Sequence, residues 1–160
     1  EVGFLGGAQV DRWGNINTTV IGDYAHPKVR LPGSGGASEI AAHAQRTIVM
    51  AKLDPRAFPE QVDFLTSPGH RCRGRPRREL GLPGSGPVKV ITDQAVLEAD
   101  GTGELVLVAL YPGVQTEQVK AGVGWPLRVR TTLLEVPPPG PRELAVLREV
   151  LDPKQLFLKG

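Results

Sequence analysis

The sequence predicts an α/β fold, with a mixed sheet and flanking helices, from three observations. Many short apolar runs of strand length alternate with a few segments of helical periodicity, an order typical of α/β proteins. The segment ADGTGE (99–104) lies between two apolar runs and predicts a β-hairpin, so that the sheet contains an antiparallel pair. With 160 residues, of which 40% are apolar, the chain is long enough to form one domain over residues 1–160 with its own core.

Strands are expected where apolar and β-branched residues lie between turn-forming residues. They are 2–6, 17–21, 47–53, 62–66, 88–92, 95–99, 104–111 and 128–134. The expected helices are 37–46, 115–122 and 141–151. The last of these begins with Pro141 in a first-turn position and places Leu144, Leu147 and Leu151 on one face.

Composition excludes several classes of protein. A net charge of +2 and 5% aromatic residues do not indicate a nucleic-acid partner, and no apolar run approaches the length of a membrane span. The single cysteine, Cys72, excludes an internal disulfide and fits the reducing cytoplasm, where we expect the protein. The chain opens at Glu1 directly into an apolar run, so we expect an N-terminal part of the protein to lie outside this sequence.

The stretch LPGSGGASEIAAHAQ (31–45) predicts a glycine-rich turn that opens a helix, an arrangement suited to an anion. It is not a phosphate-binding P-loop, because the chain contains no Gly-Lys pair, and Pro32 breaks the pattern of a nucleophile elbow at Ser34. It resembles a dinucleotide-binding loop in which Ser38 replaces the third glycine. A dinucleotide site and a plain tight turn both remain open on this pattern.

Other polar segments carry weaker signals. The run GHRCRGRPRREL (69–80) contains five arginines, which either bind phosphates or form a solvated loop. The residues His26, His43, His70 and Cys72 match no zinc spacing, so we expect no metal site. The segment QVDRWGNINTT (9–19) contains a turn of the type Asp-x-x-Gly-Asn and two amides, Asn15 and Asn17, which either belong to the turn alone or lie at the rim of a pocket.

Taken together, these segments resemble a known family. GAQVDRWGN (7–15), IGDYAHPK (21–28), GSGGA (33–37) and TSPG (66–69) follow the order seen in the β subunit of family I CoA-transferases of the glutaconate type. The resemblance continues through RELGLPG (78–84) and LREVLDPKQLF (147–157), and so covers nearly the whole chain.

The resemblance implies the fold of the CoA-transferase superfamily and a cytoplasmic hetero-oligomer with an α subunit. Such enzymes exchange CoA between an acyl-CoA and a carboxylic acid, for example a dicarboxylate such as glutaconate, through a glutamyl-CoA thioester. It implies that the CoA thioester is a substrate and that no cofactor is permanently bound. The backbone of Gly33, Ser34, Gly35, Gly36 and Ala37 is implied to contact the reacting thioester, and Asn15, Asn17 and Tyr24 are implied to line the pocket.

One motif of the family is missing from the chain. Its nucleophilic glutamate belongs to a motif upstream of the segment FLGGAQVD (4–11), and Glu39, Glu60 and Glu79 stand in other contexts. We therefore expect this chain to be the C-terminal two-thirds of the subunit. The alternatives are a CoA- or nucleotide-binding module without catalysis and a subunit of a related ring-opening hydrolase that acts on acyl-CoA.

Overall fold

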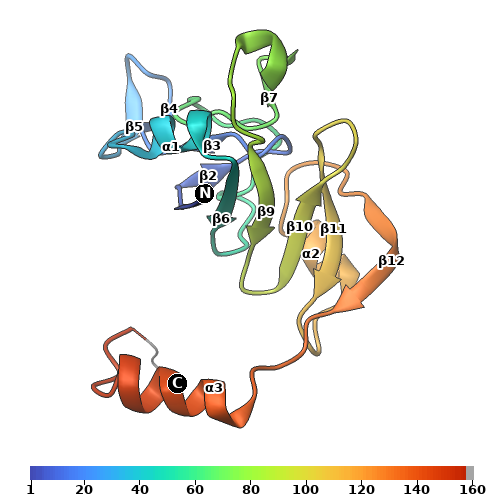
Figure 1. Cartoon of the computed structure of the whole chain (residues 1–160). Helices are drawn as coiled ribbons and strands as arrows, with labels where there is room; N and C mark the ends of the chain where they lie inside the picture. Colours follow the sequence, from blue (N-terminus) through green and yellow to red (C-terminus); the bar gives the residue numbers. More distant parts are fainter. Residues whose placement is uncertain (158–160) are drawn as a thin grey trace.

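A six-stranded mixed sheet forms the centre of the molecule in the computed structural model, which describes residues 1–157 (Figure 1). In spatial order its strands are β1 (Val2–Leu5), β6 (Arg46–Met50), β9 (Pro87–Ile91), β10 (Ala95–Ala99), β11 (Leu105–Leu110) and β12 (Val129–Glu135). The pairs β1–β6, β6–β9 and β11–β12 are parallel, whereas β10 is antiparallel to both of its neighbours. The predicted mixed α/β fold is confirmed.

The turn between β10 and β11 is the predicted hairpin. Asp100 accepts hydrogen bonds at one carboxylate oxygen from the backbone N–H groups of Thr102 (2.8 Å) and Glu104 (3.1 Å). Gly103 has φ +87°, a conformation that glycine adopts without the steric cost of a Cβ atom. The local sequence is therefore sufficient to make this turn.

The main core lies on one face of the sheet. Side chains that face one another across neighbouring strands share this face, as the Leu5–Val49 and Val90–Leu97 pairs show. The fully buried Phe58, from the loop after β6, and Val119, from helix α2 (Thr116–Ala121), pack in the same apolar cluster. The predicted helix at 115–122 is thus confirmed, and it covers the core.

Helix α1 (Ala37–His43) packs near β1, because a Cβ atom on Gly3 would lie 2.3 Å from Cγ2 of Ile40. The helix is shorter than the predicted 37–46, since Ala44 already has an extended backbone. The predicted helix 141–151 forms as α3 (Pro141–Ala145), which continues as a π-helical segment, Val146–Leu151. It lies at the end of an extended segment that leaves β12 (Figure 1). Among residues 1–157, no helix is long and apolar enough to cross a membrane.

Short hairpins extend from the sheet. They are β2–β3 (Gln9–Val10 with Ile16–Asn17), β4–β5 (Val20–Gly22 with Pro27–Arg30) and β7–β8 (Arg71–Cys72 with Arg75–Pro76), the last followed by a 3₁₀ turn, Arg77–Leu80. The predicted strand 17–21 is interrupted, because the Asn17 side chain accepts the N–H of Thr19 (2.9 Å) and turns the chain.

The prediction of a strand at 62–66 is wrong. The N–H of Asp63 donates to the side chain of Gln9 (3.0 Å), and the only β-type pairing near this segment is an isolated bridge between Ser67 and Ile16. The backbone of this segment therefore bonds to the Gln9 side chain and to Ile16, and within the described residues it pairs with no strand.

Candidate functional site

The turn at residues 11–15 is organised by a buried carboxylate. Asp11 is 1% exposed and accepts hydrogen bonds from the backbone N–H groups of Trp13 (2.9 Å) and Asn15 (3.0 Å) and from the Asn15 side chain (2.9 Å). Burial raises the pKa of Asp11, while these hydrogen bonds oppose the rise. Gly14 supplies the positive φ (+71°) that completes the turn.

Asn15 links this turn to the segment that contains TSPG. Its side-chain oxygen accepts the N–H of Gly69 (2.8 Å), and its side-chain nitrogen donates to the carbonyl of Arg71 (2.8 Å). Gly69 must lack a side chain here, because a Cβ atom would lie 2.2 Å from the carbonyl oxygen of Trp13. The structure places Asn15 in the wall of a cleft, but its side-chain amide already bonds to protein groups.

Asn17 is fully buried and plays a similar part. Its side-chain nitrogen donates to Gln9 Oε1 (2.7 Å) and to the carbonyl of Val20 (2.6 Å), while its oxygen accepts the N–H of Thr19 (2.9 Å). In this structure Asn17 supports the backbone of the turn that follows it, and it presents no surface to solvent.

The turn at residues 17–20 is hydrogen-bonded to the segment that leads into the glycine loop, which we define as residues 33–37. The carbonyl of Thr19 accepts the N–H of Leu31 (2.9 Å), and the carbonyl of Thr18 accepts the N–H of Gly33 (2.8 Å). The Thr66 hydroxyl, from TSPG, accepts the N–H of Thr18 (2.9 Å) and lies 2.8 Å from the Thr19 hydroxyl. The segments 9–19, 33–37 and 66–69 are thus brought together by direct hydrogen bonds.

The glycine loop itself is open. Gly33 and Gly35 have positive φ angles (+91° and +50°), and no atom lies within 4 Å of a Cβ built on Gly33, Gly35 or Gly36. The backbone carbonyl of Ser34 accepts the N–H of Ala37 (2.9 Å), which closes the turn into α1. Within the described part of the chain, the N–H groups of residues 34, 35 and 36 have no hydrogen-bond acceptor. These three donors are available to a ligand.

Tyr24 lies at the tip of the β4–β5 hairpin, and β5 separates it from the glycine loop in sequence. It is 58% exposed, and its ring stacks on Phe64 with the centroids 5.2 Å apart. The guanidinium of Arg30 lies 5.0 Å from the centre of the same ring. The tyrosine is therefore held in place and remains accessible.

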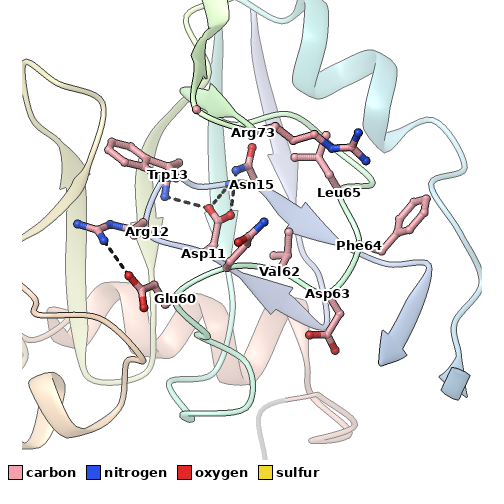
Figure 2. A pocket seen from close by; sticks show the side chains of 12 residues that line it. Asp11, Arg12, Trp13, Asn15, Glu60, Val62, Asp63, Phe64, Leu65 and Arg73 are labelled. Atoms are coloured by element: carbon pink, nitrogen blue, oxygen red, sulfur yellow. Dashed lines mark hydrogen bonds and ion pairs between the residues drawn. The ribbon is translucent and has the colours of Figure 1, made fainter. Parts of the chain in front are cut away.

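Two clefts border the segment 9–19. One, of about 440 Å³, is lined by the 11–15 turn, the segment 60–65 and Arg73 (Figure 2). In its wall, Arg12 lies 5.4 Å from the centre of the Trp13 ring and pairs with Glu60 (3.0 Å). The second, of about 820 Å³, lies where β1 and β6 end, the edge at which parallel sheets bind ligands.

The second cleft is basic. Lys28, Lys52 and Arg56 line it together with a single carboxylate, Asp54, which is paired with Arg56 (3.2 Å). Within the described residues neither lysine lies within ion-pair distance of a carboxylate. The cleft therefore favours an anion. In residues 1–157, no three His, Cys, Asp or Glu side chains are grouped as they are around a metal ion.

The sequence did not reveal two supporting residues. Thr66 lies in TSPG, a motif noted only for its resemblance, yet its hydroxyl holds the turn beside the glycine loop. Arg77 belongs to the five-arginine run, and it is buried whereas Arg73, Arg75 and Arg78 are exposed. Nothing in the local sequence separates Arg77 from the other arginines of the run, because all of them are flanked by small, proline or polar residues.

Comparison with known proteins agrees with this arrangement. The family model described as "Coenzyme A transferase" matches residues 1–122. The chain is 50% identical over 149 residues to the B subunit of the 3-oxoadipate CoA-transferase of Pseudomonas knackmussii, covering 92% of this chain and 57% of that protein. It is 42% identical over 160 residues to the B subunit of the glutaconate CoA-transferase of Acidaminococcus fermentans, covering 99% of this chain and 59% of that protein.

Solved structures extend the comparison to three dimensions. The crystal structure of the Acidaminococcus fermentans glutaconate CoA-transferase superposes with a TM-score of 0.89, over 99% of this chain and 61% of the matched chain. The IpdAB structure of Rhodococcus jostii superposes with a TM-score of 0.80 at 24% identity, covering 97% of this chain and 62% of the matched one, and so shares the fold. The chain spans less than two-thirds of the length of these relatives. By its family-model match and its identity to two B subunits, the chain belongs to the coenzyme A transferase family.

Proposed function

We propose that this chain is part of the β-type subunit of a CoA-transferase, which exchanges CoA between an acyl-CoA and a carboxylic acid. The observation that carries the proposal is the glycine loop, in which the N–H groups of residues 34–36 have no acceptor within the described residues and a Cβ atom on Gly35 or Gly36 would meet no neighbouring atom. Membership of the family and the names of the two related B subunits support the same reaction.

The reaction makes a specific demand on these donors. A glutamate carboxylate attacks the thioester carbonyl, CoA leaves as a thiolate, and an acyl-glutamyl anhydride remains. The thiolate then attacks the glutamyl carbonyl, which releases the first acid and leaves a glutamyl-CoA thioester for the second acid. Each attack places negative charge on a carbonyl oxygen, and N–H groups already oriented toward that oxygen stabilise it. In our proposal, Ser34, Gly35 and Gly36 donate these hydrogen bonds, and Gly33 and Ala37 shape the loop.

The absence of side chains lets the substrate approach. A Cβ atom on residue 36 would meet no neighbouring atom within 4 Å, so the loop leaves room there for a thioester. We propose that Tyr24 lies in the wall of the same site, because it is accessible and the strand that follows it, β5, leads into the loop. Asn15 and Asn17 serve the site by holding its backbone, since their amides are bonded to protein groups.

For the substrate we propose the CoA thioester of a dicarboxylic acid. Glutaconate and 3-oxoadipate, named in the two relatives, are both dicarboxylates. Lys28 and Lys52 give the cleft beside β1 and β6 the charge that suits a second carboxylate. CoA is here a substrate and not a resident cofactor. We further propose an α-type partner subunit and a cytoplasmic location.

The test replaces Gly36 by valine in the native gene product, co-expressed with its partner subunit. Gly36 has φ −84°, so valine is tolerated by the backbone and has room. We expect transfer of CoA between glutaryl-CoA and acetate to fall by about 100-fold or more. The valine side chain would keep the reacting carbonyl away from the backbone N–H donors, and a single such donor contributes about that much. The matched control is Gly101→Val, also in open space but in the β10–β11 turn, and it should retain wild-type turnover.

Two outcomes would overturn the proposal. Wild-type turnover in Gly36→Val would remove the loop from the reaction. If the wild-type complex transfers no CoA from any dicarboxylyl-CoA, and borohydride traps no glutamyl thioester after incubation with these substrates, the chain is a binding module and not part of a transferase.

A further inference from the structure

Arg77 is the one buried member of the five-arginine run, with 6% of its surface exposed. Its guanidinium donates hydrogen bonds to backbone carbonyls alone. The acceptors are the carbonyl oxygens of Ala41 (2.5 Å), Ala42 (2.8 Å), Gly84 (2.5 Å), Gly69 (3.2 Å) and Pro68 (3.3 Å). Its backbone N–H also donates to the carbonyl of His70 (3.0 Å).

These carbonyls belong to three separate segments. Ala41 and Ala42 form the last turn of α1, whose carbonyls have no partner within the helix. Pro68 and Gly69 belong to TSPG, and Gly84 belongs to the second copy of LPGSG (82–86). A single side chain therefore joins the end of α1 to the two loops beside it.

Gly84 reinforces the same junction. Its N–H donates to the carbonyl of Ala42 (3.0 Å), and a Cβ atom on it would lie 2.2 Å from the carbonyl of Ala44. The second LPGSG copy is thus a close-packed contact with the end of α1, whereas the first copy is the open loop at the start of that helix.

No carboxylate pairs with Arg77 among the described residues. Burial accordingly lowers its pKa, and carbonyl dipoles stabilise the charge in place of an acid. A lysine has three N–H donors in place of five and lacks the planar fork that reaches several acceptors at once. The position therefore selects for arginine.

We infer that Arg77 is a positioning residue for the glycine loop, acting through α1. The helix has seven residues, about 10 Å in length, so a shift of its last turn moves its first turn and residues 34–36 with it. The inference rests on the proposed function, because the glycine loop is the site that Arg77 would position. It gives the buried member of the arginine run a role distinct from that of the exposed ones.

The kinetic test compares Arg77→Ala with Arg78→Ala in the native complex. Arg78 is the adjacent, exposed arginine and serves as the matched control. We expect Arg77→Ala to lower kcat by about 100-fold, the loss caused by a displacement of about 1 Å, with KM for the acyl-CoA within about threefold of wild type. Added guanidinium ion should restore kcat in Arg77→Ala by filling the vacated site, and it should not restore Gly36→Val. Arg77→Lys should fall between wild type and Arg77→Ala.

A second measurement does not depend on turnover. Hydrogen–deuterium exchange of peptides from 31–44 should be faster in Arg77→Ala than in Arg78→Ala. If Arg77→Ala does not fold, Arg77→Lys takes its place in this comparison. Equal exchange in the arginine variants would overturn the inference, as would an unchanged kcat or a loss confined to KM. If the wild-type complex transfers no CoA, the proposed function fails, while the exchange data still decide whether Arg77 orders the loop.

Discussion

The side-chain amide of Asn17 donates a hydrogen bond to Oε1 of Gln9 over 2.7 Å, and both side chains are buried. Gln9 Oε1 also accepts the N–H of Asp63 (3.0 Å), so the pair joins β2, β3 and the segment 62–66. The same Asn17 amide holds the turn that bonds to the glycine loop. A buried polar pair outside the central sheet thus determines the backbone around the candidate site.

Asn17→Ala should lower the free energy of unfolding by about 2–3 kcal/mol, because it leaves the buried Val20 carbonyl and the partly buried Thr19 N–H without their hydrogen-bond partner. Urea unfolding of the native protein measures this loss. Gln61→Ala, an exposed glutamine nearby, is the control and should change stability by less than about 0.5 kcal/mol. Equal unfolding midpoints for the two variants would show that the amide network contributes nothing.

The two copies of LPGSG should respond differently to the same substitution. Gly84→Ala places a methyl group 2.2 Å from the Ala44 carbonyl, so we expect a loss of about 3 kcal/mol or more. Gly33→Ala meets no atom and suffers only from its φ of +91°, which costs about 1–2 kcal/mol. Thermal unfolding of both variants shows which one loses more stability. A larger loss of stability in Gly33→Ala than in Gly84→Ala would contradict the close packing at Gly84.

Asp100 should contribute to stability that is lost in acid. Partial burial disfavours its charged form, but hydrogen bonds from Thr102 and Arg128 prevail and lower its pKa from 3.8 to about 2. The unfolded chain then binds the proton more readily than the folded one, so the contribution is complete above about pH 5 and falls as the pH drops toward 2. Its size is on the order of 1–2 kcal/mol after solvent screening.

Urea unfolding between about pH 5 and about pH 2.5 tests this contribution. Asp100→Asn should remove this part of the pH dependence, and Thr102→Ala, which deletes the hydroxyl donor at 2.6 Å, should remove a fraction of it. The prediction fails if the stability of wild type and Asp100→Asn changes with pH in parallel.

Cys72 should react slowly with thiol reagents in the folded protein. It is 8% exposed, lies 3.5 Å from the Asn15 side chain, and burial raises its pKa. Because the thiolate is the reactive form, alkylation by iodoacetamide should be at least about 100-fold slower in the native protein than in urea. As the chain has one cysteine, an intact-mass measurement reads its labelling directly. Similar rates in both conditions would place Cys72 at the surface.

Local sequence predicted the elements whose stability depends on near neighbours. The strands β9, β10 and β11, the hairpin at Asp100 and the start of α3 at Pro141 all follow from periodicity and turn chemistry within a few residues. The segment 62–66 has the same apolar pattern and forms no strand, because its backbone is bonded to Gln9 and Ile16. Pattern alone does not distinguish these two cases.

By itself, then, the sequence determined a mixed α/β fold, the position of the open glycine loop and, by resemblance, the family. Tertiary structure decided what each polar residue does, because those partners are distant in the chain: Asn15 bonds to Gly69, 54 residues away, and Arg77 to Ala41, 36 residues away. Five arginines with the same local chemistry and two identical LPGSG segments separate into different roles for this reason. Burial and the atoms within hydrogen-bond reach are properties of the folded chain, and no local pattern specifies them.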